Sequence, residues 1–377
     1  MSEISVGGDG SAEDRHEKLA RLKPYVLPKP ALAARRWRIE RMRLAVQLLS
    51  LAVVVWIGFR FVRWVARLQA GDLAAARPPG VEGFLPISSL ITLRHWLESG
   101  ELSRVHPAGL VILLLAIGTG LLLKKAFCSW ICPVGFVSET LAGVGRRLFR
   151  RKIRLPRGLD WPLRGLKYLL LAFFVYSIFV SMKASDIAAF LNSPYNRVAD
   201  IKMMLFFANI SAFALKVMAV LVALSVVIPF FWCRFLCPYG ALLGLFSLVS
   251  PLKITRTASR CIDCGLCARA CPAGIGVDRA RRVRSDECTA CLSCVAACPV
   301  PVALQVETRG PWRRAVRPAL FAALVVLLFY GGIQVARLSG YWASDITNQE
   351  YQRRIQEIDA PAYHHNQGQV PPDERGD

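Results

Sequence analysis

The sequence contains no C-x2-C-H motif, no phosphate-binding loop and no G-x-G-x-x-G motif at a strand-to-helix step. The first absence excludes a covalently attached c-type haem. The other two disfavour a nucleotide-driven enzyme. The 377 residues include five histidines, none in the middle of an apolar run, which disfavours a bis-histidine haem within a membrane. Acidic residues are also scarce, with 26 Asp and Glu against 48 Lys and Arg.

Hydrophobicity and positive charge are both high in this chain. Hydrophobic residues make up 54% of it, the mean hydropathy is +0.39 and the formal net charge is +22. This hydrophobicity excludes an intrinsically disordered protein. The charge must be segregated from the apolar runs, as it is on the cytoplasmic face of a membrane protein, so it does not by itself indicate nucleic-acid binding.

Five apolar runs approach the roughly 20 helical residues that cross a bilayer core of about 30 Å. Basic residues flank almost every run, which favours membrane spans over buried core helices. Because 43 mostly polar residues precede the first run, we expect it to be a retained anchor and not a signal peptide. The predicted spans are 44–62, 107–123, 166–182, 213–231 and 318–336.

The distribution of Lys and Arg predicts how these spans are oriented. The three connections on one side of a five-span chain carry 34 of these residues, and the three on the other side carry 14. Since basic connections face the cytoplasm, we expect a multi-pass protein of the bacterial inner membrane with a cytoplasmic N-terminus and an extracytoplasmic C-terminus. The basic connections are 1–43, 124–167 and 232–317.

The membrane segments resemble each other in pairs. FCSWICPVG at 127–135 is similar to WCRFLCPYG at 232–240, and FLPIS at 84–88 is similar to FLNSP at 190–194. The two offsets agree, at 105 and 106 residues. We therefore expect an internal duplication of a two-span unit, in which the halves are related by an axis along the membrane normal.

Eight of the twelve cysteines form two C-x2-C-x2-C-x3-C-P motifs, at 261–272 and 288–299. This is the spacing by which bacterial ferredoxins hold [4Fe–4S] clusters, and in two-cluster ferredoxins the fourth cysteine of each motif binds the other cluster. We therefore predict one cluster held by Cys261, Cys264, Cys267 and Cys298, and a second held by Cys288, Cys291, Cys294 and Cys271. Both are expected on the cytoplasmic side.

Zinc and disulfides are the alternatives for these eight cysteines. A zinc site needs four thiolates from paired C-x2-C steps, whereas each motif here has a third cysteine step and ends in Cys-Pro. Disulfides are disfavoured because the motifs face the reducing cytoplasm. The short run from Val302 to Val306 is expected to form a small strand.

The other four cysteines form two C-x3-C-P pairs, each at the inner end of a returning span. The i,i+4 spacing places both thiols of a pair on one helical face, and the prolines disfavour helix at the cysteine before them. Two such pairs at one depth could offer four thiolates to a further centre, for which copper and iron–sulfur both suit the soft ligands. Four reduced structural thiols remain the alternative. The pairs are Cys128 with Cys132 and Cys233 with Cys237.

The segment 77–96 is apolar but interrupted by Pro and Gly, so we expect a re-entrant or interfacial segment covered by protein. Titratable residues in this and the matching outer loop are candidates for the proton acceptor that a quinone head-group requires. Ordinary polar residues of the membrane interface are the simpler interpretation. The four candidates are Glu82, His95, Asp186 and Arg197.

With these motifs, roughly residues 44–308 resemble the membrane-bound polyferredoxin family. Its members include NapH-type quinol dehydrogenase subunits, the membrane half of NosR-type proteins and CcoG/FixG-type oxidase-assembly proteins. The resemblance implies electron transfer between the quinone pool, cytoplasmic-side clusters and a partner, and it does not single out one branch. It rests on 77–88, 127–135, 193–203, 232–244 and the two ferredoxin motifs.

The expected fold is a mainly α, polytopic membrane protein with about five transmembrane helices and an inserted small α+β 2[4Fe–4S] ferredoxin-like domain. The polar C-terminal segment is expected to be poorly ordered. The predicted units are a basic cytoplasmic arm (1–43), a four-span core (44–250), the ferredoxin-like domain (251–308), a fifth transmembrane helix with its flanks (309–343) and an extracytoplasmic tail (344–377).

The expected function is relay of electrons between the quinone pool and a partner redox protein, with a quinol dehydrogenase subunit as one form. Two other interpretations stay open. The chain could be an assembly factor that binds or reduces copper through the C-x3-C-P cysteines, or a membrane redox sensor whose basic arm (15–43) docks a partner. Nucleic acid is not an expected partner, because orientation and attraction to anionic lipids explain that arm.

Overall fold

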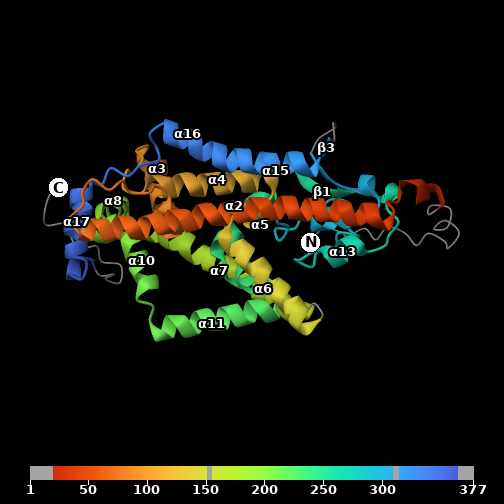
Figure 1. Cartoon of the computed structure of the whole chain (residues 1–377), viewed down its shortest axis with the longest axis horizontal. Helices are drawn as coiled ribbons and strands as arrows, with labels where there is room; N and C mark the ends of the chain where they lie inside the picture. The colour runs from red at the N-terminus through yellow and green to blue at the C-terminus, as the bar shows by residue number, and fades with distance from the viewer. Residues whose placement is uncertain (1–19, 151–154, 309–313, 364–377) are drawn as a thin grey trace.

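The computed structural model describes residues 20–150, 155–308 and 314–363, and this part of the chain is mostly helical. The helix α2 (Lys29–Gln69) runs along most of the long axis of the molecule (Figure 1). The ferredoxin-motif segments and a small sheet lie at one end of that axis, and the helix α17 (Asn348–Gln356) lies at the other. Regions far apart in sequence therefore meet along α2.

The length of α2 allows it to contact both ends of the molecule. Its 41 residues extend over about 60 Å at 1.5 Å per residue, about twice the hydrocarbon thickness of a bilayer. We call residues 251–308, which contain both ferredoxin motifs, and the short strand after them the ferredoxin region. The helix α2 lies against α14 (Ser293–Ala296) of this region, against α15 (Pro318–Val326) along its middle and against α17 at its far end. The apolar part of α2 thus continues, within one helix, into a basic part that lies against the cysteine motifs.

A second central helix, α4 (Pro107–Leu123), lies between helices from the N-terminal and the middle parts of the chain. It is flanked by α3 (Pro86–Ser99) and α12 (Pro238–Ser247). Small residues such as Ala116 and Gly120 are buried on α4, and they let α12 approach closely. The 17 residues of α4 correspond to about 25 Å.

Seven further helices precede the ferredoxin region, of which α6, α7 and α11 lie on one side of α2 (Figure 1). They are α5 (Phe127–Trp130), α6 (Pro133–Phe149), α7 (Arg157–Tyr176), α8 (Ala184–Asn192), α9 (Pro194–Arg197), α10 (Ala199–Ala208) and α11 (Ala212–Val227). Short 3-10 turns lie at Lys23–Tyr25, Val81–Phe84, Ala258–Arg260, Pro301–Ala303 and Pro361–Tyr363. Three π-helical segments lie at Ser177–Ser181, Trp232–Leu236 and Leu327–Gly331.

Among the described residues, three helices are long and apolar enough to cross a membrane: Lys29–Gln69, Gly158–Ser181 and Pro318–Leu338. A fourth crossing is present if α10 and α11, bent by 83° at their junction, count as one span. The expected span at 107–123 is the shorter apolar helix α4. The chain is therefore a helical protein with three or four candidate membrane spans, where the sequence predicted five.

The ferredoxin region contains a small antiparallel sheet of order β1-β2-β3. Its strands are β1 (Lys253–Arg256), β2 (Leu304–Glu307) and β3 (Ala315–Val316), with Ile254 opposite Val306 in the register. The strand expected near Val302–Val306 corresponds to β2. Two short helices, α13 (Leu266–Ala270) and α14, each follow the first cysteines of a motif.

The C-terminal region differs from its sequence-based expectation. We expect a poorly ordered tail over 344–377, yet α17 forms within it and buries Tyr351 and Ile355. Tyr351 packs edge-on against Trp64 of α2, with ring centroids 5.0 Å apart. The polar composition of α17 conceals the apolar face it presents to α2; residues 364–377 lie outside the described part of the chain. The chain reaches α17 through α15 and α16 (Gly332–Leu338).

Candidate metal centres

Two cavities in the ferredoxin region are bounded by cysteines of both motifs. The first is lined by three cysteines of the first motif and one of the second: Cys261, Cys264, Cys267 and Cys298. The second is lined by the reverse combination: Cys271, Cys288, Cys291 and Cys294. In each motif the fourth cysteine therefore lies beside the other motif's cavity.

The loops of the two motifs share an unusual backbone conformation. The residues before and after the second cysteine have positive φ in both: Asp263 (51°) and Gly265 (67°) in the first motif, Ala290 (49°) and Leu292 (61°) in the second. Alternating left- and right-handed residues turn successive backbone N–H groups toward one side, which forms a concavity that favours an anion. A thiolate-ligated iron–sulfur cluster is such an anion.

Burial raises the pKa of the cysteine thiols around both cavities. It raises the pKa of Cys267 to about 11 and that of Cys288 to about 11, while Cys271, Cys294 and Cys298 also shift upward. Neighbouring thiolates add to these shifts, because like charges disfavour ionisation. Positive iron in each cavity would remove this penalty, so the donor set fits a metal cluster.

Within residues 20–150, 155–308 and 314–363, no group of three or more His, Cys, Asp or Glu side chains is close enough to hold a single metal ion. Each of the two cavities is bounded by four cysteines, which is the number of thiolates that a [4Fe–4S] cluster requires.

The C-x3-C-P cysteines occupy corresponding places in two helix-break-helix segments. Cys132 and Cys237 precede the first residues of α6 and α12, where Pro133 and Pro238 begin these helices. The Cys237 thiol accepts a hydrogen bond from the Gly240 backbone N–H at 3.3 Å, a stabilising arrangement for a thiolate at a helix N-terminus.

All four thiols of the C-x3-C-P pairs are half-buried near one another, and we call them the cysteine quartet: Cys128, Cys132, Cys233 and Cys237. Burial raises the pKa of each one. For Cys128 the three other thiols of the quartet add to the rise, whereas Lys125 opposes it. Helices from both halves of the membrane core therefore bring these four thiols into one region.

The cysteine quartet adjoins the second cavity. Ser129, the residue after Cys128, donates from Oγ to the carbonyl of Thr289, the residue after Cys288, at 2.6 Å. The indole Nε1 of Trp130 donates to the Ala290 carbonyl at 3.1 Å. The membrane core thus meets the ferredoxin region at the second cavity.

Buried lysines surround this junction. Lys124 Nζ donates to the Ser285 carbonyl at 2.8 Å, and Lys125 Nζ lies 3.4 Å from the Asp286 carbonyl. Lys167 of α7 forms ion pairs with Asp286, at 3.4 Å, and with Glu287. Burial would raise the pKa of Asp286, but a hydrogen bond from Tyr168 and the nearby lysines lower it. Asp286 is therefore held ionised against the membrane core.

The first cavity adjoins the N-terminal part of α2 instead. Arg35 Nη1 donates to the Cys298 carbonyl at 2.9 Å, and the Leu27 N–H donates to the Pro299 carbonyl at 2.9 Å. Part of the basic N-terminal arm is thus docked on the ferredoxin region. The residues of that arm before 20 lie outside the described part.

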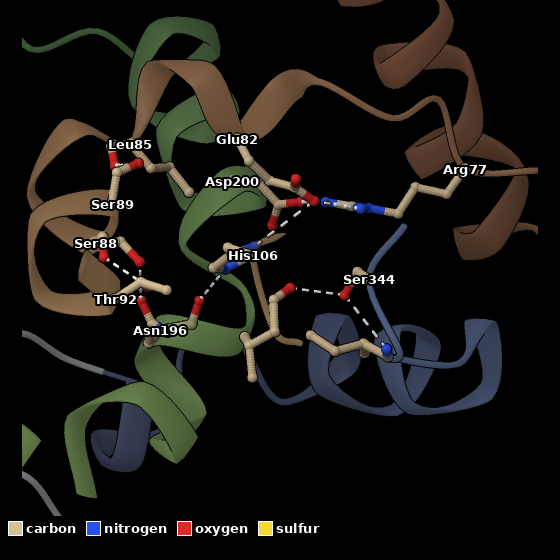
Figure 2. A network of polar contacts seen from close by, with 12 residues as sticks. Arg77, Glu82, Leu85, Ser88, Ser89, Thr92, His106, Asn196, Asp200 and Ser344 are labelled. Carbon is tan, nitrogen blue, oxygen red and sulfur yellow. Dashed lines mark hydrogen bonds and ion pairs between the residues drawn. The ribbon is translucent and has the colours of Figure 1, made fainter. Parts of the chain in front are cut away.

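A separate buried network lies at the other end of α4 (Figure 2). The Arg77 guanidinium bridges two carboxylates, with Nη1 at 2.7 Å from Glu82 Oε1 and Nη2 at 2.6 Å from Asp200 Oδ2. Both carboxylates are completely buried. His106 donates from Nε2 to the Asn196 carbonyl at 2.6 Å, because a carbonyl can only accept. The other ring nitrogen, Nδ1, faces Glu82 Oε1 at 3.9 Å.

This network carries one more negative than positive charge when His106 is neutral. Burial would lower the pKa of His106, but Glu82, Asp200 and the Asn196 carbonyl raise it. Burial would raise the pKa of Glu82, but His106 and Arg77 lower it. Protonated His106 therefore balances the charge of the network, which joins loops before α3 and α4 to α9 and α10.

The four residues expected at a quinone site do not come together. Glu82 belongs to the buried network, whereas His95 is half-buried on α3. Asp186 accepts from the Lys183 N–H at 3.0 Å at the start of α8, and Arg197 pairs with Glu350 of α17 at 2.7 Å. Sequence reasoning missed Arg77, His106 and Asp200. The one available signal was a histidine directly before the proline that starts an apolar run.

Comparisons with known proteins locate two iron–sulfur signatures. A family model described as a 4Fe-4S binding domain matches residues 105–156 and 210–257, which contain the cysteine quartet. A second model, described as a 4Fe-4S dicluster domain, matches residues 253–299. No solved structure shows a significant match.

Curated relatives share the same segments. YccM of Escherichia coli (strain K12), named as a candidate electron transport protein, is 45% identical over 326 residues, 85% of this chain and 91% of YccM. NirI of Paracoccus denitrificans is 30% identical over 233 residues, 59% of this chain and 33% of NirI. The ferredoxin-type protein NapH of E. coli is 26% identical over 185 residues, 48% of this chain and 59% of NapH.

Proposed function

The chain belongs to the membrane polyferredoxin-type family of iron–sulfur electron-transfer proteins, and from that premise we propose that it relays electrons between the quinone pool and a partner redox protein through two [4Fe–4S] clusters. The observation that carries this proposal is the pair of cavities, each bounded by three cysteines of one motif and the fourth of the other. That crossed arrangement is how two-cluster ferredoxins ligate their clusters.

The proposed ligands of the first cluster are Cys261, Cys264, Cys267 and Cys298, and those of the second are Cys271, Cys288, Cys291 and Cys294. When bound, each cluster supplies one-electron chemistry at thiolate-ligated iron. The surrounding chain has three tasks: the turned backbone N–H groups stabilise the anionic site, apolar side chains such as Ile254 and Val283 exclude water, and Lys124 offsets negative charge.

We propose the cysteine quartet as a further centre, between the membrane and the second cluster. Its support is the presence of four half-buried thiols in one region, the presence of Lys125 beside Cys128, and the match of these segments to a 4Fe-4S binding model. The match to a 4Fe-4S binding model favours iron–sulfur over copper. Copper handling by the same thiols is the second candidate function.

The length of α4 limits where a quinone could exchange electrons with the cysteine quartet. The Glu82 network and Lys124 flank α4, whose 17 residues separate them by about 25 Å. Electron tunnelling fades steeply with distance, so a quinol at Glu82 could not reduce the cysteine quartet directly. We therefore propose that quinone exchanges electrons near the quartet, and that the Glu82 network is structural. His95, Asp186 and Arg197 do not form a common site with Glu82 or with one another.

The proposed topology has five crossings, with α4 and the α10–α11 pair each counted as one, and the N-terminus and both clusters in the cytoplasm. It is supported by the alternation of Lys and Arg along the chain and by the corresponding positions of Cys132 and Cys237 in the two halves. These correspondences also support the internal duplication.

Anaerobic purification with metal and sulfide quantification tests this function. Two clusters predict about eight iron and eight acid-labile sulfide per chain, and a third predicts about twelve. Addition of a reduced quinone should then produce the EPR signals of reduced clusters. Stoichiometric copper that is lost in C128S/C233S would favour copper handling, and the absence of sulfide would reject the relay.

A further inference from the structure

The two cavities differ in their access to solvent. Each cavity has two buried cysteines, but only the first has an exposed one among the described residues, which is Cys264. The second cavity is also covered by the membrane core through Trp130 and the Lys167 ion pairs. A soluble molecule can therefore come closest to the cysteines at Cys264 of the first cavity.

Arginines surround the exposed cavity, and we call four of them the arginine rim. Arg256 lines the cavity, Arg260 directly precedes Cys261, and Arg269 Nη2 donates to the Cys264 carbonyl at 3.1 Å. The carbonyl of Arg281 accepts from the Arg256 N–H at 2.8 Å, and its side chain is exposed. Arg260 and Arg269 are also exposed.

Acidic groups do not balance this rim. Residues 251–308 contain eight Lys and Arg against five Asp and Glu. Two of the acidic residues, Asp286 and Glu287, are engaged by Lys167 at the membrane core. Beside the exposed cavity, Asp263 pairs with Arg256 at 3.1 Å, and Asp278 lines the cavity. Positive charge therefore dominates the face around Cys264.

We propose that the arginine rim docks an acidic one-electron carrier protein of the cytoplasm, such as a small ferredoxin or flavodoxin. This inference rests on the proposed relay function and names its soluble partner. One electron leaves the reduced first cluster and enters the oxidised carrier, or moves in reverse, and no bond or proton changes place. Complementary charge speeds encounter and orients the partner with its cofactor toward Cys264.

The position of the rim favours a protein over the lipid surface. Arg35, which contacts Cys298, lies nine residues before the predicted first span at 44, or about 13 Å farther along α2. The first cavity thus lies farther from the membrane than the second cavity, which contacts the membrane core. A lipid head-group could satisfy the charge but could not exchange an electron with an exposed cluster.

Binding measurements on the full chain test the inference. The cluster-loaded protein is placed in nanodiscs of zwitterionic lipid, and an acidic [2Fe–2S] ferredoxin and a basic cytochrome c are the probes in surface plasmon resonance. We expect binding of the ferredoxin alone, weakened about tenfold or more between 20 and 200 mM salt because exposed charges are screened. R260E/R281E should weaken it about tenfold further. R147E/R150E, with the same charge change at the end of α6, should leave it unchanged.

The outcomes separate this inference from the relay itself. If the clusters are present and reducible but the ferredoxin binds wild type and R260E/R281E equally, the rim is not the docking surface and the relay still stands. Equal binding of cytochrome c, or binding only when anionic lipid is added, also overturns the inference. Absence of clusters from the wild-type protein rejects the relay instead. Stopped-flow electron exchange with the same variants should follow the order of their affinities.

Discussion

The indole Nε1 of Trp130 donates a 3.1 Å hydrogen bond to the carbonyl of Ala290, and this contact joins the first C-x3-C-P segment to the second ferredoxin motif. Trp130 is completely buried, and its ring also packs against Phe321 of α15. One side chain thus connects the membrane core, the cluster loop and the last membrane helix.

The substitution W130F should destabilise the protein without removing the clusters. It keeps an aromatic ring but leaves the buried Ala290 carbonyl without its donor, which costs about 1–3 kcal/mol. The thermal midpoint measured by intrinsic fluorescence should fall by several degrees. W161F is the matched control, since Trp161 is 82% exposed; an equal effect of both substitutions would contradict the role of the hydrogen bond.

The substitution K124M should lower the reduction potential of the second cluster. Lys124 is buried beside Cys288, and its positive charge favours the reduced, more negative cluster. Redox titration followed by EPR measures both clusters in one sample, so the first cluster is the internal control. A second cluster that titrates at the wild-type potential would show that Lys124 does not act on it electrostatically.

The stability of the Glu82 network should depend on pH through His106. Its folded pKa is raised above the unfolded value of 6.5, so its contribution is complete below pH 6.5 and is lost as the pH rises through the folded pKa. Glu82 acts in the opposite sense: its folded pKa is lowered, so its contribution is present above pH 4.5 and is lost in acid. The groups that face His106 are Glu82, Asp200, Arg77 and the Asn196 carbonyl.

We therefore expect the thermal midpoint to fall between pH 6 and pH 9, and we expect H106Q to reduce this slope. The matched control is H95Q, which changes a half-buried histidine on α3 outside the network. An H106Q protein with the full wild-type slope would show that His106 does not carry the dependence.

The substitution G135A should disturb the cysteine quartet more than G240A. A Cβ atom at Gly135 would lie 1.9 Å from the Cys128 carbonyl oxygen, whereas one at Gly240 would lie 3.3 Å from the corresponding Cys233 oxygen. Forcing an atom into such a site costs about 1–3 kcal/mol or more. Thermal midpoints and metal content measure both effects. G118A, with nothing within 4 Å, is the control; equal effects of all three would contradict the close approach.

Much of the iron–sulfur region was predictable because its chemistry is encoded in local spacing. Cysteines two residues apart must share a turn, and the same four-cysteine sets that the spacing predicts line the two cavities. The membrane family was predictable for the same reason, from the C-x3-C-P segments. The comparisons confirm that family.

The contacts between regions were not predictable, since they depend on tertiary packing. No local pattern places Trp130 against Ala290 or Arg35 against Cys298. The Glu82–Arg77–Asp200 network joins residues more than 100 positions apart. The apolar face of α17 was hidden by its polar composition, and the bend between α10 and α11 lies just before the predicted span at 213–231.

The crossed ligand sets are tested most directly by counting iron in two double variants purified anaerobically. If Cys271 and Cys288 serve one cluster, C271A/C288A removes only that cluster and retains the other, about four iron, together with any iron at the quartet. C261A/C271A then removes both clusters, and so retains about four iron fewer. An iron content that is higher in C261A/C271A than in C271A/C288A would contradict the account. Wild-type protein without acid-labile sulfide would also contradict it.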